Sequence, residues 1–144
     1  MRTLIQRTGK ASCTIDNKVY SKIDEGLVVL VGFTEGDSIK EIEWMVKKIV
    51  NLRIFPDENG VMNKSILDFG GEILSISQFT LYADCSKGNR PGYTKALGGD
   101  NSSPLYDLFN EELKKYIEVK TGVFGADMTI EINNIGPTTI MIEK

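Results

Sequence analysis

The sequence predicts an α+β fold in which antiparallel-rich β-sheets pack face to face and helices cover one side. Three observations support this. About eight segments either alternate apolar and polar residues or run continuously apolar, and most follow one another across short turns. Two longer segments have apolar residues at helical spacing. The length of 144 residues fits one domain, residues 1–144, able to bury a core without disulfides or metals.

Strands are predicted before the first helix at residues 4–8, 11–15, 19–23 and 27–33. The first two are expected to join at Gly9-Lys10, and Asp16-Asn17 to turn the chain into the third. The fourth is an apolar run rich in β-branched residues, which is typical of a central strand covered on both faces.

A helix is predicted over residues 38–50, where one helical face is apolar. Ser38 and Glu41 have the spacing of a capping box at its start. Trp44 lies away from the middle of the apolar stripe, so we expect it to pack at the edge of the core.

The remaining elements follow from turn and capping signals. Residues 62–68 fit either one helical turn or an ordered loop. Ser103 as N-cap and Pro104 at the first helical position predict a second helix that ends near Thr121-Gly122. Further strands are predicted at residues 52–55, 73–82, 128–133 and 138–142, the last two joined through residues 134–137.

The strand at residues 73–82 is unusually rich in hydroxyl and amide side chains. Alternation would place Gln78 and Thr80 on one face, and Ser77 and Phe79 on the other. These polar groups either bond to neighbouring backbone in a half-buried strand, or mark a pocket where Thr80 and the backbone N–H groups of Phe79 and Thr80 face a ligand.

A long polar connection follows at residues 83–103. Loops of this length in compact domains often border binding sites. It carries Lys87, Arg90 and Lys95 together with Tyr93, a set able to hold a phosphate and stack on a base. A solvated loop with ordinary surface charge is an equally good interpretation of the same residues.

Composition excludes several kinds of chemistry. The chain has no histidine, so it has no Ser-His-Asp or Cys-His machinery, no HExxH zinc site and no imidazole base. No cofactor or metal is predicted. Cys13 and Cys85 suggest neither a disulfide framework nor a CxxC site. A net charge of −3 gives no global attraction to nucleic acid, so any RNA contact is expected to be local.

The first residues contain no apolar signal segment, and no stretch reaches the length of a membrane span. We therefore expect a cytoplasmic protein with no membrane partner.

Together these motifs resemble the D-aminoacyl-tRNA deacylase family, which removes D-amino acids mischarged onto tRNA. The resemblance runs from Met1 to the last strand. It rests on Gln6-Arg7, Asp37, Met62-Asn63, Ser77-Gln78-Phe79-Thr80-Leu81, Lys87-Gly88, Arg90-Pro91, Leu105-Tyr106, Phe124-Gly125-Ala126, Met128, Gly136-Pro137 and Thr139.

The resemblance implies a homodimer of three-layer ββα subunits. It also implies a cis peptide at Gly136-Pro137 that reaches into the partner's active site, where the two carbonyls hold the substrate's α-amino group and exclude an L side chain. Arg7 would support this loop, or form a structural ion pair, and Met128 would pack against the pocket. Without the other motifs, Gly136-Pro137 would be interpreted as an ordinary turn.

The implied reaction suits a chain without histidine, because an aminoacyl ester is already activated. It needs a positioned water and stabilisation of an oxyanion. The N–H groups of Phe79 and Thr80, with Ser77 and Gln78 beside them, are the catalytic candidates, and the 2′-hydroxyl of the terminal adenosine would help activate water and select RNA over DNA. Thr80 as nucleophile ranks second, because no base is evident. Lys87 and Arg90 are the candidate tRNA contacts.

The chain departs from the family pattern in several places. Gly92-Tyr93 stands where Ser-Phe is usual, Ile135 replaces an Asp, Thr138 replaces Val, and Ser102 replaces a small apolar residue. The loss of the Asp is expected to leave the Gly-Pro segment less well anchored. Ser102 is expected to alter how strictly the pocket rejects or accepts a glycyl group, which has no side chain to exclude.

Three functions follow from the sequence. The first is hydrolysis of D-aminoacyl-tRNA, with glycyl-tRNA as a further substrate. The second is a non-catalytic module that binds the aminoacylated end of tRNA. The third, a general esterase, is disfavoured because the chain has neither a serine nucleophile elbow nor a histidine.

Overall fold

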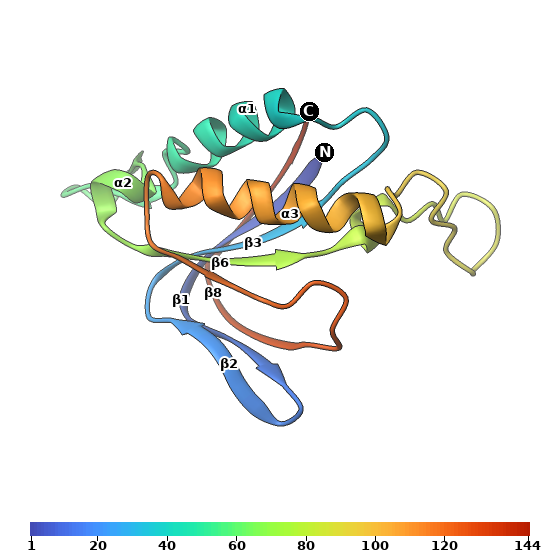
Figure 1. Ribbon diagram of the computed structural model, residues 1–144. Coiled ribbons are helices and arrows are strands. Elements are labelled where there is room, and N and C mark those ends of the chain that lie inside the picture. Colours follow the sequence, from blue (N-terminus) through green and yellow to red (C-terminus); the bar gives the residue numbers. More distant parts are fainter.

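The computed structural model describes all residues from 1 to 144, and they form three layers (Figure 1). Helices α1 (Ile39–Val50) and α3 (Gly99–Lys114) lie side by side over one face of the sheet. On the other face the sheet curls into a second β-layer, so the predicted α+β class is confirmed. The other elements are β1 (Arg2–Ile15), β2 (Lys18–Ile23), β3 (Gly26–Gly32), β4 (Phe55–Pro56), β5 (Met62–Lys64), α2 (Ile66–Phe69), β6 (Glu72–Ser77), the 3₁₀ helix η1 (Phe79–Tyr82), β7 (Val119–Thr121) and β8 (Thr129–Glu143).

The main sheet is mixed. Its strands follow the order β2-β1-β3-β6-β7, and β8 pairs with β1 outside this path. β1 pairs antiparallel with β2, β3 and β8, whereas β3 with β6 and β6 with β7 are parallel. Parallel neighbours need long crossovers, and α1 and α3 occupy the two that this sheet requires.

Two apolar cores lie on opposite faces of the central strands β3 and β6. Leu27 and Val29 of β3 face the helices, and the alternate residue Val28 faces the second β-layer. In β6, Ile73 belongs to the first core and Leu74 to the second. The prediction of a central strand covered on both faces is confirmed for β3.

The prediction of two strands joined at Gly9-Lys10 is wrong, because β1 continues through both residues. Its pairing with β8 shifts register between Thr8 and Ala11, so the glycine lies at a bulge that bends one long strand. The turn at Asp16-Asn17 is confirmed, with positive φ angles of 50° and 60° that suit a tight hairpin.

The first helix and its capping box are confirmed. The backbone N–H of Ser38 donates to Glu41 Oε2 at 2.9 Å, and Ser38 Oγ accepts from the N–H of Lys40 at 3.3 Å. Trp44 is 37% exposed beside the buried stripe, as predicted.

The second helix begins earlier than predicted. Gly98 is its N-cap and Gly99 its first residue, so Pro104 lies inside the helix and not at its start. Pro104 is the sixth residue of the helix, so its missing N–H leaves the carbonyl of Asp100 without that helical hydrogen bond. Ser102 N–H bonds to Gly98 O at 2.9 Å, which shows that the helix is formed before Ser103.

Two other predicted segments differ in the structure. The second helix ends at Lys114, and the residues predicted as its last turn form β7 beside β6. Of residues 52–55 only Phe55 joins a strand, which pairs with β5. Residues 62–68, left open by the sequence, form β5 and the start of α2. Short apolar runs fit a strand or a helix edge equally well, which explains these differences.

The last two predicted strands are the two arms of β8. On β1, Gln6 pairs with Thr139 and Thr8 pairs with Asn134, so residues 135–138 have no partner and project from the ladder. We call these residues the Gly-Pro loop. No helix of the structure combines the length and apolarity needed to cross a membrane.

Candidate active site

A cavity of about 610 Å³ opens where the parallel strands β3 and β6 end and α3 begins. Its size is typical of small-molecule sites. Most of its lining is apolar or glycine, and Asp127 is its only charged side chain. We call it the pocket. Its lining includes Val31, Phe33, Ile76, Ser77, Gln78, Phe79, Tyr93, Leu97, Gly98, Ser102, Phe124, Ala126, Asp127 and Met128.

The polar strand predicted at residues 73–82 stops at Ser77, which corrects its length. The Gln78 N–H still bonds to Val31 O at 2.7 Å, but β3 itself ends at Gly32, and no ladder remains beyond it. The chain turns into η1, so Gln78 and Thr80 do not share a strand face. Gln78 Nε2 contacts Thr80 Oγ1 directly.

This turn leaves two backbone donors free, one on Phe79, which lines the pocket, and one on the next residue, Thr80. The N–H groups of Phe79 and Thr80 are the first of η1, where no preceding carbonyl can accept them, and neither has a hydrogen-bond partner. Ser77, Gln78 and Phe79 line the pocket, whereas the exposed Thr80 does not. The site therefore offers backbone N–H groups that can donate hydrogen bonds to a ligand, and the pocket has no basic side chain.

Two aromatic rings form the rim of the pocket. Phe79 and Tyr93 pack edge to face, with centroids 5.0 Å apart and planes 65° apart. Phe79 remains 54% exposed and Tyr93 40%. Exposed apolar surface beside a cavity is typical of a binding site.

Met128 and Ser102 both line the pocket. Ser102 belongs to α3, and Met128 directly precedes β8. Met128 Sδ would lie 2.6 Å from a Cβ built on Gly122, so glycine is required there for this placement. Ser102 is buried, and its hydroxyl donates only a long 3.4 Å bond to Gly99 O. Sequence patterns predicted both residues near the pocket but gave no signal for Asp127 or Gly122.

The long loop after η1 is ordered by its own backbone. Asp84 and Gly92 exchange two hydrogen bonds of 2.8 and 2.9 Å. Hydrogen bonds from Ser86 lower the pKa of Asp84. Lys87 and Arg90 are exposed, form no ion pair and do not line the pocket.

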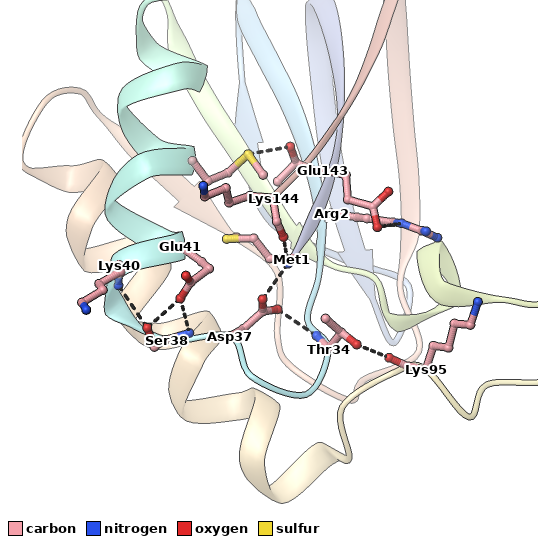
Figure 2. Close-up of polar contacts among 12 residues, drawn as sticks. Met1, Arg2, Thr34, Asp37, Ser38, Lys40, Glu41, Lys95, Glu143 and Lys144 are labelled. Atoms are coloured by element: carbon pink, nitrogen blue, oxygen red, sulfur yellow. Dashed lines mark hydrogen bonds and ion pairs between the residues drawn. The ribbon is translucent and has the colours of Figure 1, made fainter.

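A polar network ties the base of this loop to the ends of the sheet (Figure 2). Thr34 Oγ1 donates to Lys95 O at 2.6 Å, and the Thr34 N–H donates to Asp37 Oδ2 at 2.8 Å. The other Asp37 oxygen pairs with the Met1 ammonium at 2.6 Å, and both groups are almost fully buried. The segment that carries Tyr93 is therefore fixed to the core.

The Gly-Pro loop is exposed and held by side chains on both sides. Its Gly136-Pro137 peptide is cis, and Gly136 has a φ of 115°. Asn134 Nδ2 donates to Arg7 O at 2.9 Å and to Thr138 O at 3.1 Å. The lack of an Asp at position 135 was expected to leave this loop less well anchored. Asn134 provides side-chain hydrogen bonds there instead, a role that the sequence did not reveal.

Arg7 lies beside the same loop. One guanidinium nitrogen donates to Ile54 O at 2.6 Å, and another lies 3.1 Å from a Cβ built on Gly136. Arg7 forms no ion pair, and its support of the loop stays a prediction.

Within one chain the two parts of the predicted site do not meet. Gly136, Pro137 and Arg7 are absent from the lining of the pocket. No group of three or more His, Cys, Asp or Glu side chains is arranged to hold a metal ion.

The family model described as D-Tyr-tRNA(Tyr) deacylase matches residues 4–143. The chain belongs to this family. Proteins named D-aminoacyl-tRNA deacylase from Bacteroides fragilis and Parabacteroides distasonis are 57% and 54% identical to it. These matches cover 99% and 100% of this chain, and 97% of each relative.

Solved structures share the fold of this D-Tyr-tRNA(Tyr) deacylase family member. One named c-Myc DNA Unwinding Element Binding Protein is 41% identical, with a TM-score of 0.96 over 100% of this chain and 99% of that one. Another, described as a probable eukaryotic D-amino acid tRNA deacylase, is 18% identical, with a TM-score of 0.83 over 98% of this chain and 97% of that one. The second match shows the fold alone.

Proposed function

We propose that this protein hydrolyses the ester bond of D-aminoacyl-tRNA in the cytoplasm and releases the free D-amino acid and tRNA. One observation carries the chemistry: the backbone N–H groups of Phe79, which lines a pocket with no basic side chain, and of the next residue, Thr80, have no hydrogen-bond partner. Membership of the family and the names of its relatives support the substrate.

In the proposed reaction a water attacks the ester carbonyl carbon. The carbonyl oxygen becomes an oxyanion that accepts from the N–H groups of Phe79 and Thr80, which are stronger donors here than in water. The bond from carbon to the ribose oxygen then breaks, and the ribose hydroxyl leaves with the proton that the water gives up. The neighbouring 2′-hydroxyl of the terminal adenosine relays that proton, so a DNA end is not a substrate.

We propose further that the active enzyme is a homodimer in which each Gly-Pro loop enters the partner's pocket. Three features support this: the loop is exposed, it is held by Asn134 and Arg7, and it lies outside the pocket of its own chain. The carbonyls of Gly136 and Pro137 would then hold the α-amino group and leave no space for an L side chain. Glycine has no side chain to exclude, so glycyl-tRNA is also expected to be hydrolysed.

Lys87 and Arg90 are the proposed contacts to the phosphates of the tRNA 3′ end. They are exposed, without ion-pair partners, and belong to the same ordered loop as Tyr93 at the rim. Their substitution by Ala is expected to raise KM for charged tRNA and leave kcat unchanged.

The deciding experiment compares D-tyrosyl-tRNA and L-tyrosyl-tRNA on one tRNA. We expect release of tyrosine from the D form only. Tight binding without release would support the binding module, and faster hydrolysis of simple aryl esters than of charged tRNA would support an esterase. Equal hydrolysis of both enantiomers would contradict the proposed selection.

Thr80→Ala separates the two catalytic models. If the backbone carries the chemistry, kcat should fall less than about tenfold, because the N–H groups remain. A loss of roughly a thousandfold or more, with binding intact, would instead identify the Thr80 hydroxyl as the nucleophile.

A further inference from the structure

The outward face of α1 carries lysines on both sides of a tryptophan. Lys40 and Lys48 are each four residues from Trp44, and Lys47 is three residues from it. Residues at these spacings are neighbours on one helical face. All four side chains are exposed, and Figure 2 shows Lys40 pointing away from the sheet at the start of the helix. We call this set the α1 face.

Two ammonium groups converge on the ring of Trp44. Lys48 Nζ lies 5.5 Å from the ring centroid, and Nζ of Lys144, from the end of the chain, lies 5.2 Å from it. Each contact is a favourable cation–π interaction, but two like charges beside one ring repel each other. An anion bound beside the ring would be attracted by both charges.

The lysines of the α1 face have no carboxylate partners. Lys40, Lys47 and Lys48 form no ion pair, whereas Lys114 and Lys115 of α3 pair with acids on their own helix. The chain as a whole has a net charge of −3, so this cluster of lysines is a local feature.

Neither acidic residue of α1 forms an ion pair with these lysines. Glu41 accepts from Ser38 in the capping box, which lowers its pKa. Glu43 is exposed and lies three residues from Lys40 and four from Lys47, but it forms no ion pair with either. The α1 face therefore carries three lysines, none of them held in an ion pair.

We propose that the α1 face binds the phosphate backbone of RNA, with the lysines on successive phosphates and Trp44 packed against ribose. This inference rests on the proposed function, in which the RNA is the body of the tRNA whose 3′ end enters the pocket. The end of β3 lines the pocket and leads directly into α1, so the face begins at the pocket end of the molecule. A helix of 12 residues extends about 18 Å, long enough to follow several phosphates.

The test compares two substrates that differ only in RNA length: D-tyrosyl-tRNA and the D-tyrosyl ester of adenosine. The variants are Lys47→Ala/Lys48→Ala and Trp44→Ala. The matched control is Lys114→Ala/Lys115→Ala, which removes the same charge from ion-paired positions. For the α1 variants, KM for charged tRNA should rise roughly tenfold at low salt, with kcat unchanged. KM for the adenosine ester should not change.

Salt dependence provides a readout that a structural defect would not produce. The slope of log KM against log salt concentration should become shallower by about one for each phosphate that the lysine variant no longer neutralises. The control should keep the wild-type slope. Equal effects on both substrates, or the same rise in KM for the control, would overturn the proposal.

Binding of uncharged tRNA keeps this test separate from the proposed function. If the wild-type protein releases no amino acid from either substrate, the proposed activity is wrong. Fluorescence anisotropy with uncharged tRNA then still decides the role of the α1 face. Binding weakened by the α1 variants but not by the control supports it, and binding unaffected by both overturns it.

Discussion

The hydroxyl group of Tyr82 is buried without a hydrogen-bond partner, and this gives a prediction for a single residue. Burial is the main cause that raises the pKa of Tyr82 to about 12. The ring packs under the Arg2 guanidinium, 4.6 Å from its centroid, and phenylalanine would keep this contact. Tyr82→Phe should therefore be as stable as the wild type at pH 8, or more stable by up to about 1 kcal/mol.

The pH dependence of that variant follows from the same pKa. Because the folded pKa lies above the unfolded value of about 10, the wild type keeps its full stability below pH 10 and loses part of it as pH rises toward 12. Tyr82→Phe lacks this loss, so its advantage should widen over that range. Urea unfolding of both proteins from pH 8 to 11.5 checks this. A constant difference would show that Tyr82 titrates normally.

Gly122 gives a second residue-scale prediction, for the shape of the pocket. A Cβ at this position would lie 2.6 Å from Met128 Sδ and 3.0 Å from Ile76 Cδ1. Gly122→Ala should push the flexible Met128 side chain into the pocket and raise KM roughly tenfold, with little loss of stability.

Gly98→Ala is the control, because it also lines the pocket, has a φ of −60° and has open space around its Cβ position. Combining Gly122→Ala with Met128→Ala should restore KM. If the double variant is as impaired as the single one, the defect lies in the backbone at residue 122 and not in Met128.

At the scale of elements, the loop that carries Tyr93 is predicted to depend on its hydrogen bond to Thr34. Thr34 Oγ1 donates to Lys95 O at 2.6 Å (Figure 2). Thr34→Val keeps the side-chain shape and removes this donor, so stability should fall by about 1 kcal/mol. KM should rise while kcat changes little, because the rim of the pocket loosens. Unchanged amide exchange of residues 93–97 would contradict this.

Elements with a strong local signal were predicted correctly, and those fixed by neighbours were not. The capping box at Ser38 and the apolar β3 carry their own signals. The end of β6 at Ser77 does not, because it is set by where its partner β3 stops. Pro104 marked the wrong helix start because Gly98, without a capping side chain, gives no signal of its own.

The same distinction explains what could be predicted of the candidate site. Ser77, Gln78, Phe79 and Met128 were proposed from the sequence, and the structure brings them to one pocket. The role of Asn134 depends on backbone atoms of Arg7 and Thr138 that approach only in the folded sheet. No sequence pattern reports such a contact, so Asn134 was missed.

At the scale of the whole molecule, the two parts of the site are separated in each chain, and this can be tested by mixing subunits. Gly136→Val should inactivate the Gly-Pro loop, because a Cβ there would lie 2.7 Å from the backbone nitrogen of Thr138. Ala126→Trp should fill the pocket, which Ala126 lines. Each variant alone is expected to be inactive on D-tyrosyl-tRNA.

Unfolding and refolding the two variants together should restore activity. In a mixed dimer the intact loop of one protomer meets the intact pocket of the other, so one of its two sites is complete. Random pairing at equal amounts should therefore recover roughly a quarter of wild-type activity. Circular dichroism of each variant verifies that it folds. If both variants are folded and dimeric but the mixture remains inactive, the loop and the pocket do not complete each other across the dimer, because only a site shared between protomers can be restored by exchanging them.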